Sequence, residues 1–105
     1  MDKVASLREI LEQDPANTFA RYGLAMEYAG RGETAAALAE FDRLRGDHPE
    51  YTAGYFMAAQ TLAKAGRHAD AKQRLVDGIA CARRTGNQHA QREMQAMLDE
   101  MEIPE

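Results

Sequence analysis

The side chains best suited to chemistry in this sequence are three histidines and one cysteine. His48, His68 and His89 are the only histidines, and they lie in three different segments. No two of them are four residues apart, and they do not form the combined His and Cys patterns that metal-binding motifs need. We expect these histidines to be exposed to solvent or to cap helices. We therefore predict no metal site and no cofactor.

Cys81 is the only cysteine, so an internal disulfide is excluded. It lies within a helical pattern and is followed closely by Arg83 and Arg84. Positive neighbours favour a reactive thiolate, but no second cysteine and no adjacent histidine accompany it. We expect Cys81 to be a small buried hydrophobic residue.

The carboxylates also lack the arrangement of a catalytic pair. Glu9 and Glu12, and the acidic residues between 99 and 102, are typical of solvated helix faces and helix ends. Gly30-Arg31-Gly32 is not a phosphate loop, because no strand precedes it and no Gly-Lys-Ser/Thr follows it. No side chain resembles a nucleophile with its base. The sequence predicts no catalytic residue, and we expect that the protein is not an enzyme.

The composition favours a protein partner over nucleic acid or a membrane. The 105 residues suffice for one domain with its own core. The formal net charge of −4 lacks the basic excess that nucleic-acid binding needs. No stretch approaches the roughly 18 apolar residues of a membrane span, and the first residues are mixed in charge, unlike a signal peptide. We expect a cytoplasmic protein.

The elements that position these side chains repeat along the chain with a period of 34 residues, as from Pro15 to Pro49. A period of 20 to 50 residues is typical of stacked repeat units. The matching positions carry small, turn and bulky apolar residues, as a stack of helices needs. The pairs are Thr18/Thr52, Ala25/Ala59, Ala29/Ala63, Gly32/Gly66, Ala35/Ala69, Ala37/Ala71, Tyr22/Phe56, Tyr28/Leu62 and Phe41/Leu75.

Apolar residues at intervals of three and four predict helices only, and no segment alternates with the period of a strand. Asn17 and Asn87 are suited to cap helix starts, and Gly32 and Gly66 are suited to end helices. Arg83 stands where a third proline is due, so the fifth helix is expected to run longer. The predicted helices cover about 2–13, 18–31, 34–45, 51–65, 68–84 and 87–101.

This pattern resembles the tetratricopeptide repeat (TPR), a helix-turn-helix unit of 34 residues. The sequence departs from the family pattern with Arg21 in place of Trp, Leu44 in place of a small residue, Ala58 in place of Leu and Arg83 in place of Pro. The first unit supplies Leu24, Ala25, Tyr28, Gly32, Ala37, Phe41 and Pro49. The second supplies Tyr55, Ala59, Leu62, Gly66, Ala71, Leu75 and Gly78.

The resemblance implies an all-α fold in which antiparallel helix pairs stack as a short right-handed solenoid of about six helices. We expect one domain, residues 1–105, with repeats at about 18–51 and 52–85. The first helix aligns with the second half of a repeat, because Leu7 lies 34 residues before Phe41. A capping helix at about 87–101 carries Met94, Met97 and Met101 on one side and polar residues on the other.

In the TPR family the first helix of each pair lines a concave face that binds a peptide or helix of a partner. The resemblance therefore implies a mostly apolar groove, suited to an amphipathic helix or an extended apolar segment. It lacks the paired cations with which some members clamp carboxylates. The residues expected to contact the partner are Phe19, Tyr22, Met26, Phe56, Met57, Gln60 and Lys64, flanked by Ala29, Ala53 and Ala63.

Three uses of this surface stay open from the sequence. It can be an open groove of an interaction or scaffold module that binds a protein or peptide partner. It can be the interface of a homo-oligomer, to which the methionines of the last helix would contribute. It can also be covered by that last helix and serve only the core.

Overall fold

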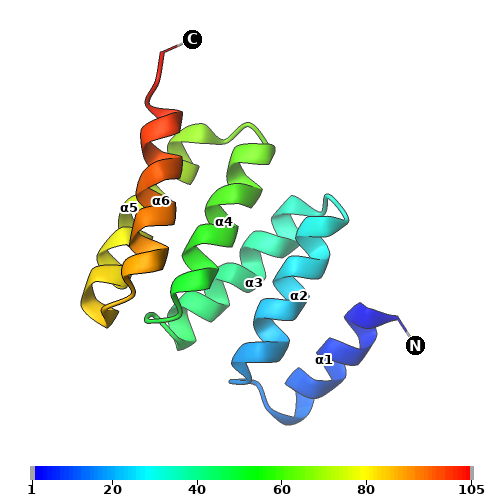
Figure 1. Cartoon of the computed structure of the whole chain (residues 1–105). Coiled ribbons are helices and arrows are strands. Elements are labelled where there is room, and N and C mark those ends of the chain that lie inside the picture. Colours follow the sequence, from blue (N-terminus) through cyan, green and yellow to red (C-terminus); the bar gives the residue numbers. More distant parts are fainter. Residues whose placement is uncertain (1, 105) are drawn as a thin grey trace.

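The computed structural model describes residues 2–104, and this range contains six α-helices and no strand (Figure 1). The predicted all-α class is therefore confirmed, and each helix begins and ends within two residues of its predicted range. None of the described helices is both long and apolar enough to cross a membrane. The helices are α1 (Lys3–Gln13), α2 (Thr18–Gly30), α3 (Thr34–Asp47), α4 (Thr52–Lys64), α5 (His68–Thr85) and α6 (Gln88–Met101).

Local signals in the sequence explain where the helices begin and end. The Asn17 side chain accepts a hydrogen bond from the backbone N–H of Ala20 at 2.8 Å, and so caps α2. At the other end of α2, Gly32 has a φ of 75°, a left-handed conformation that favours glycine. There the N–H of Glu33 donates to the carbonyl of Tyr28 at 2.9 Å, which satisfies a terminal carbonyl. The same turn recurs at Gly66, so the pairs α2–α3 and α4–α5 are connected by the same kind of turn.

The helices form two layers, and each helix packs mainly on its neighbours along the chain. In Figure 1, α2, α4 and α6 lie side by side in the nearer layer, with α3 and α5 behind them. The described chain extends over 44 × 30 × 18 Å, an elongated shape typical of a short stack. This arrangement brings one face of α2, α4 and α6 onto a common surface.

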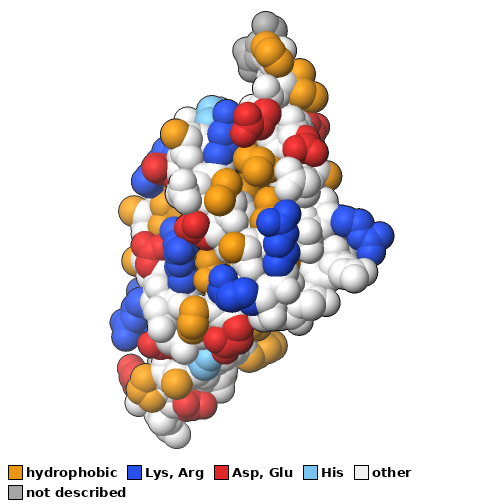
Figure 2. Space-filling view, turned by 90° about the vertical axis from the view of Figure 1, so that its left-hand side faces the viewer, with side chains coloured by type: hydrophobic (Ala, Val, Ile, Leu, Met, Phe, Trp, Pro, Cys, Tyr) orange, Lys and Arg blue, Asp and Glu red, His pale blue; other side chains and the backbone are white. Residues whose placement is uncertain are grey.

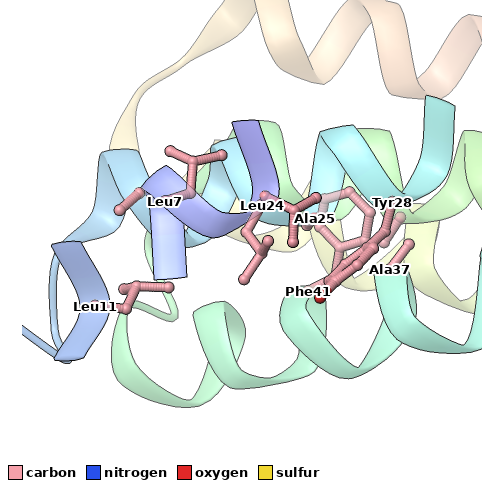
Figure 3. Close-up of a cluster of buried hydrophobic side chains, with 10 residues drawn as sticks. Leu7, Leu11, Leu24, Ala25, Tyr28, Ala37 and Phe41 are labelled. Carbon is pink, nitrogen blue, oxygen red and sulfur yellow. The ribbon is translucent and has the colours of Figure 1, made fainter. Parts of the chain in front are cut away.

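The core of the first pair lies where α2 and α3 approach closely (Figure 3). Ala25 and Ala37 are fully buried between the two helices, and Phe41 and Tyr28 fill the space beside them. Leu7 of α1 closes the open side of the same cluster. Small residues permit the close approach, because a larger side chain would push the helices apart.

The interfaces between successive pairs match a large residue to a glycine. Leu44 stands where the family prefers a small residue, and a Cβ added at Gly54 of α4 would lie 3.1 Å from Leu44 Cδ2. Between α5 and α6 the roles are exchanged. A Cβ at Gly78 would lie only 2.5 Å from Met94 Sδ and 2.7 Å from Tyr55 Cβ. Leu44 therefore departs from the family pattern without disturbing the stack, because Gly54 accommodates it.

Arg21, which replaces the Trp of the family pattern, makes a buried polar contact instead of an apolar one. Arg21 is only 5% exposed. Its guanidinium lies 2.9 Å from a Glu40 carboxylate oxygen and donates to the Pro15 carbonyl at 3.0 Å. Its Nε has no hydrogen-bond partner. Arg21 thus joins α2 to α3 and to the turn before α2.

We expect the substitution Gly78→Ala to lower the free energy of unfolding by about 1–3 kcal/mol, because the new methyl group overpacks the α5–α6 interface. Gly46→Ala in α3 is the matched control. Nothing lies within 4 Å of a Cβ at Gly46, so there the gain in helix propensity should stabilise the protein by about 0.5–1 kcal/mol. Urea unfolding followed by circular dichroism measures both. Equal stability of the Gly78 variant and the wild type would contradict this packing.

We expect Arg21→Leu to lower the free energy of unfolding by about 2–3 kcal/mol, because it leaves the Glu40 carboxylate largely buried without its cation. The double variant Arg21→Leu/Glu40→Leu should recover most of this loss, since two apolar side chains need no partner. Thermal and urea unfolding of the wild type, the two single variants and the double variant measure this double-mutant cycle. Arg67→Leu is the control, because its pair with Asp70 is more than half exposed and contributes at most about 1 kcal/mol. Additive effects of the single substitutions would show that Arg21 and Glu40 do not depend on each other.

Candidate functional site

The common surface of α2, α4 and α6 holds two neighbouring clefts. The first, called here the α2–α4 cleft, has a volume of about 400 Å³. Its apolar wall consists of Met26 and Ala29 on α2 and Met57 on α4. Its polar side chains are those of Thr34, Gln60, Thr61 and Lys64. Methionine is flexible and polarisable, so this wall can adapt to different apolar side chains.

The second, the α4–α6 cleft, has a volume of about 510 Å³. It lies between Phe56 and Gln60 on α4 and one side of α6. Gln60 lines both clefts, and so the two adjoin each other at α4. We call the two clefts together the groove. The α6 wall consists of Glu93, Ala96, Met97 and Glu100.

The structure brings five of the seven predicted contact residues to the groove. Met26, Met57, Gln60 and Lys64 line the α2–α4 cleft, and Phe56 lines the α4–α6 cleft. Phe19 lines neither cleft, and it is 78% exposed near the start of α2. The five remain the candidates for contact with a partner.

Tyr22, which the sequence predicted to contact a partner, packs against other aromatic rings of the chain. Its ring centroid lies 5.4 Å from that of Tyr51 and 6.5 Å from that of Phe41, in tilted and edge-to-face geometry. Burial raises the pKa of the Tyr22 phenol above its usual value, and Tyr51 acts in the same direction. Tyr22 therefore serves packing, and its side chain is partly buried against the core.

Sequence reasoning missed the contribution of Glu93, Ala96 and Glu100 to the groove. The signal is the start of the helices: α2 begins at Thr18, α4 at Thr52 and α6 at Gln88, which gives intervals of 34 and then 36 residues. The extra two residues follow from α5, which runs to Thr85 without the third proline. With an offset of 36 residues, Glu93 on α6 occupies the position equivalent to Met57 on α4. It therefore lies on the groove.

The last helix forms a wall of the groove and leaves the groove accessible. It packs on α5 and touches α4. Phe56 and Met97 are both partly buried against the cluster that contains Tyr55, Leu75 and Met94. Within residues 2–104, α6 thus covers part of Phe56 and still leaves the α4–α6 cleft beside it.

The chemistry-bearing side chains lie apart from one another. Cys81 is fully buried, 3.6 Å from Thr52 Oγ1, and its Sγ donates to the Pro49 carbonyl at 3.4 Å. His48 Nε2 lies 2.8 Å from the Ala16 carbonyl oxygen, and it links two turns. Over the range the structure describes, no group of three or more His, Cys, Asp or Glu side chains could hold a metal ion.

A third cleft, of about 520 Å³, lies between α3 and α5, and its charges pair with one another. Arg45 meets Asp77 at 2.9 Å and Arg74 meets Asp42 at 2.7 Å across it. On the side of the molecule toward α5 and α6, Figure 2 shows hydrophobic side chains in small patches among Lys, Arg, Asp and Glu. The Arg and Asp side chains of the α3–α5 cleft are therefore already engaged with one another.

Comparisons with known proteins agree with this fold. The chain is 31% identical to a tetratricopeptide repeat domain protein from Salinibacter ruber, whose solution structure matches 85% of this chain and 90% of its own with a TM-score of 0.79. The solution structure of protein BPP2914 from Bordetella parapertussis covers 96% of this chain and 88% of its own, at 27% identity and a TM-score of 0.83. The TPR repeat-containing protein PA0015 of Pseudomonas aeruginosa is 27% identical over 99 residues, which is 94% of each chain. No family model matches the chain.

The paired helices, the alanines between them and these relatives define an α-helical repeat protein. The chain belongs to the tetratricopeptide repeat family. Proteins of this family are in general interaction modules without catalysis of their own, and their partners are other proteins.

Proposed function

We propose that the protein is an interaction or scaffold module that holds a peptide segment or helix of a partner protein in the concave groove formed by α2, α4 and α6. The observation that carries the proposal is that the two clefts lie side by side on α2, α4 and α6 and adjoin each other at Gln60. We place the module in the cytoplasm, in keeping with a single buried cysteine and hence no internal disulfide.

The composition of the groove supports a peptide ligand. Met26, Ala29 and Met57 offer apolar area, and Phe56 offers a flat ring that is only partly buried. Covering such side chains with a partner removes apolar surface from water, which makes the binding free energy more favourable. Gln60 and Lys64 can bond to the polar backbone of a bound segment. The surface is small, so we expect affinities near micromolar, roughly −8 kcal/mol.

A random peptide library displayed on phage and selected against the full chain tests the groove. We expect Phe56→Ala to weaken the enriched peptides at least about tenfold in calorimetric titration, because it removes an aromatic anchor. Gln60→Ala, which changes a side chain outside the core, should also weaken them. Val76→Ala on α5 is the matched control, since Val76 is 49% exposed and lies outside the groove. Unchanged affinity for both groove variants, with the fold intact, would place the site elsewhere.

Self-association through the same surface is the alternative. Phe56 favours it, because this aromatic side chain on the α4–α6 cleft is only partly buried and a second copy could cover it as well as a peptide could. For the open groove we expect a monomer in sedimentation velocity at every concentration. A mass that rises with concentration and falls back to the monomer in Phe56→Ala would support the oligomer and contradict the open groove.

A further inference from the structure

We infer that the partner segment carries basic side chains against α6 and apolar side chains over α2 and α4. This inference rests on the proposed use of the groove and adds the chemistry of its ligand. The occupant is an extended stretch of a partner chain in which Lys or Arg residues adjoin Leu, Met or Phe residues.

The charge of the α6 wall carries the inference. Glu93 and Glu100 both line the α4–α6 cleft, and no Lys or Arg lines it. They are seven residues apart, about 10 Å along the same side of a helix. Residues 88–101 contain three carboxylates, Glu93, Asp99 and Glu100, against one arginine, Arg92, which gives 1 − 3 = −2 with His89 neutral.

These carboxylates are available to a partner, unlike those of the third cleft. Within residues 2–104 Glu100 makes no ion pair. Glu93 Oε1 meets only His89 Nε2, at 3.0 Å, and that imidazole is 86% exposed. In the α3–α5 cleft, by contrast, Asp42 and Asp77 each have an arginine of the facing helix. A cation of a partner would therefore find carboxylates on α6 that no Lys or Arg within residues 2–104 engages in an ion pair.

Lys64 sets the direction in which the segment lies. It lines the α2–α4 cleft and does not line the α4–α6 cleft. A basic side chain placed over α2 and α4 would meet this like charge, whereas the same side chain over α6 meets Glu93 and Glu100. The apolar part of the segment then covers Met26 and Met57.

The spacing of the helices sets the length of the segment. Packed helices lie about 8–10 Å apart, so the path from α2 across α4 to α6 is about 20 Å. An extended chain rises about 3.3 Å per residue, and about six residues cross the groove. One or two of these six residues reach the α6 wall.

The test selects the same phage-displayed library against the wild type and against Glu93→Lys/Glu100→Lys. We expect the wild type to enrich peptides that combine Lys or Arg with apolar residues, and the charge-reversed variant to enrich Asp or Glu at the same places. Glu93→Gln/Glu100→Gln should weaken the peptides selected by the wild type about three- to tenfold at low ionic strength. The difference should shrink as salt rises, because exposed charges are screened.

Glu9→Gln/Glu12→Gln is the matched control, because it removes the same charge from the exposed side of α1, outside the groove. It should leave the affinity unchanged. Peptides that depend on Phe56 but contain no excess of basic residues would overturn this inference and leave the proposed function intact. Peptides indifferent to Phe56→Ala and Gln60→Ala would overturn both. A self-association that the charge-reversed variant abolishes would assign the groove to a second copy and overturn the inference.

Discussion

The close approach of the two helices in each pair, through alanines, is the constraint on which the rest of the structure depends. Ala25 meets α3 and Ala59 meets α5 with no exposed surface left on either residue. Because these contacts admit no larger side chain, they fix how each first helix is rotated about its axis. The rotation that buries Ala25 places Met26 and Ala29 at the edge of the buried side, where they are partly buried against the core and line the groove. Core packing and groove composition are therefore two consequences of one arrangement.

The spacing between successive pairs depends on a second kind of contact, in which one helix supplies a large residue and the other a glycine. Leu44 fits against Gly54 on one interface, and Met94 fits against Gly78 on the next. The large residue comes from the first helix of one interface and from the second helix of the other, yet both interfaces bring the helices close. This spacing decides how far α2, α4 and α6 lie from one another, and so it determines the width of the groove that a partner segment must cross.

The sequence predicted all six helices but did not predict which residues of the last helix reach the groove. The six helices followed from the small residues and turn glycines at intervals of 34, as at Gly32 and Gly66. The longer α5 and the start of the last helix were predicted from Arg83 and Asn87, but the resulting offset of 36 was not used to carry the groove positions onto α6. For that reason Glu93 was not assigned to the groove. The contact of Tyr22 with Tyr51 was missed because Tyr51, predicted as the first helical residue, is the N-cap of α4, where the direction of a side chain does not follow the helical period.

The same interval explains why α6 differs on its two sides. Counted 36 residues from Ala59, the position of close approach is occupied by Gln95, which is half-buried and donates from Nε2 to Asp99 Oδ1 at 2.9 Å. A further helix packed there, as α3 packs on α2, would bury this amide and carboxylate at a cost that apolar contacts would have to offset. The outer side of α6 is therefore suited to water, while its inner side, with Met97 between Glu93 and Glu100, is suited to a partner. In this way a helix that follows the two complete pairs contributes the most distinctive charges of the groove.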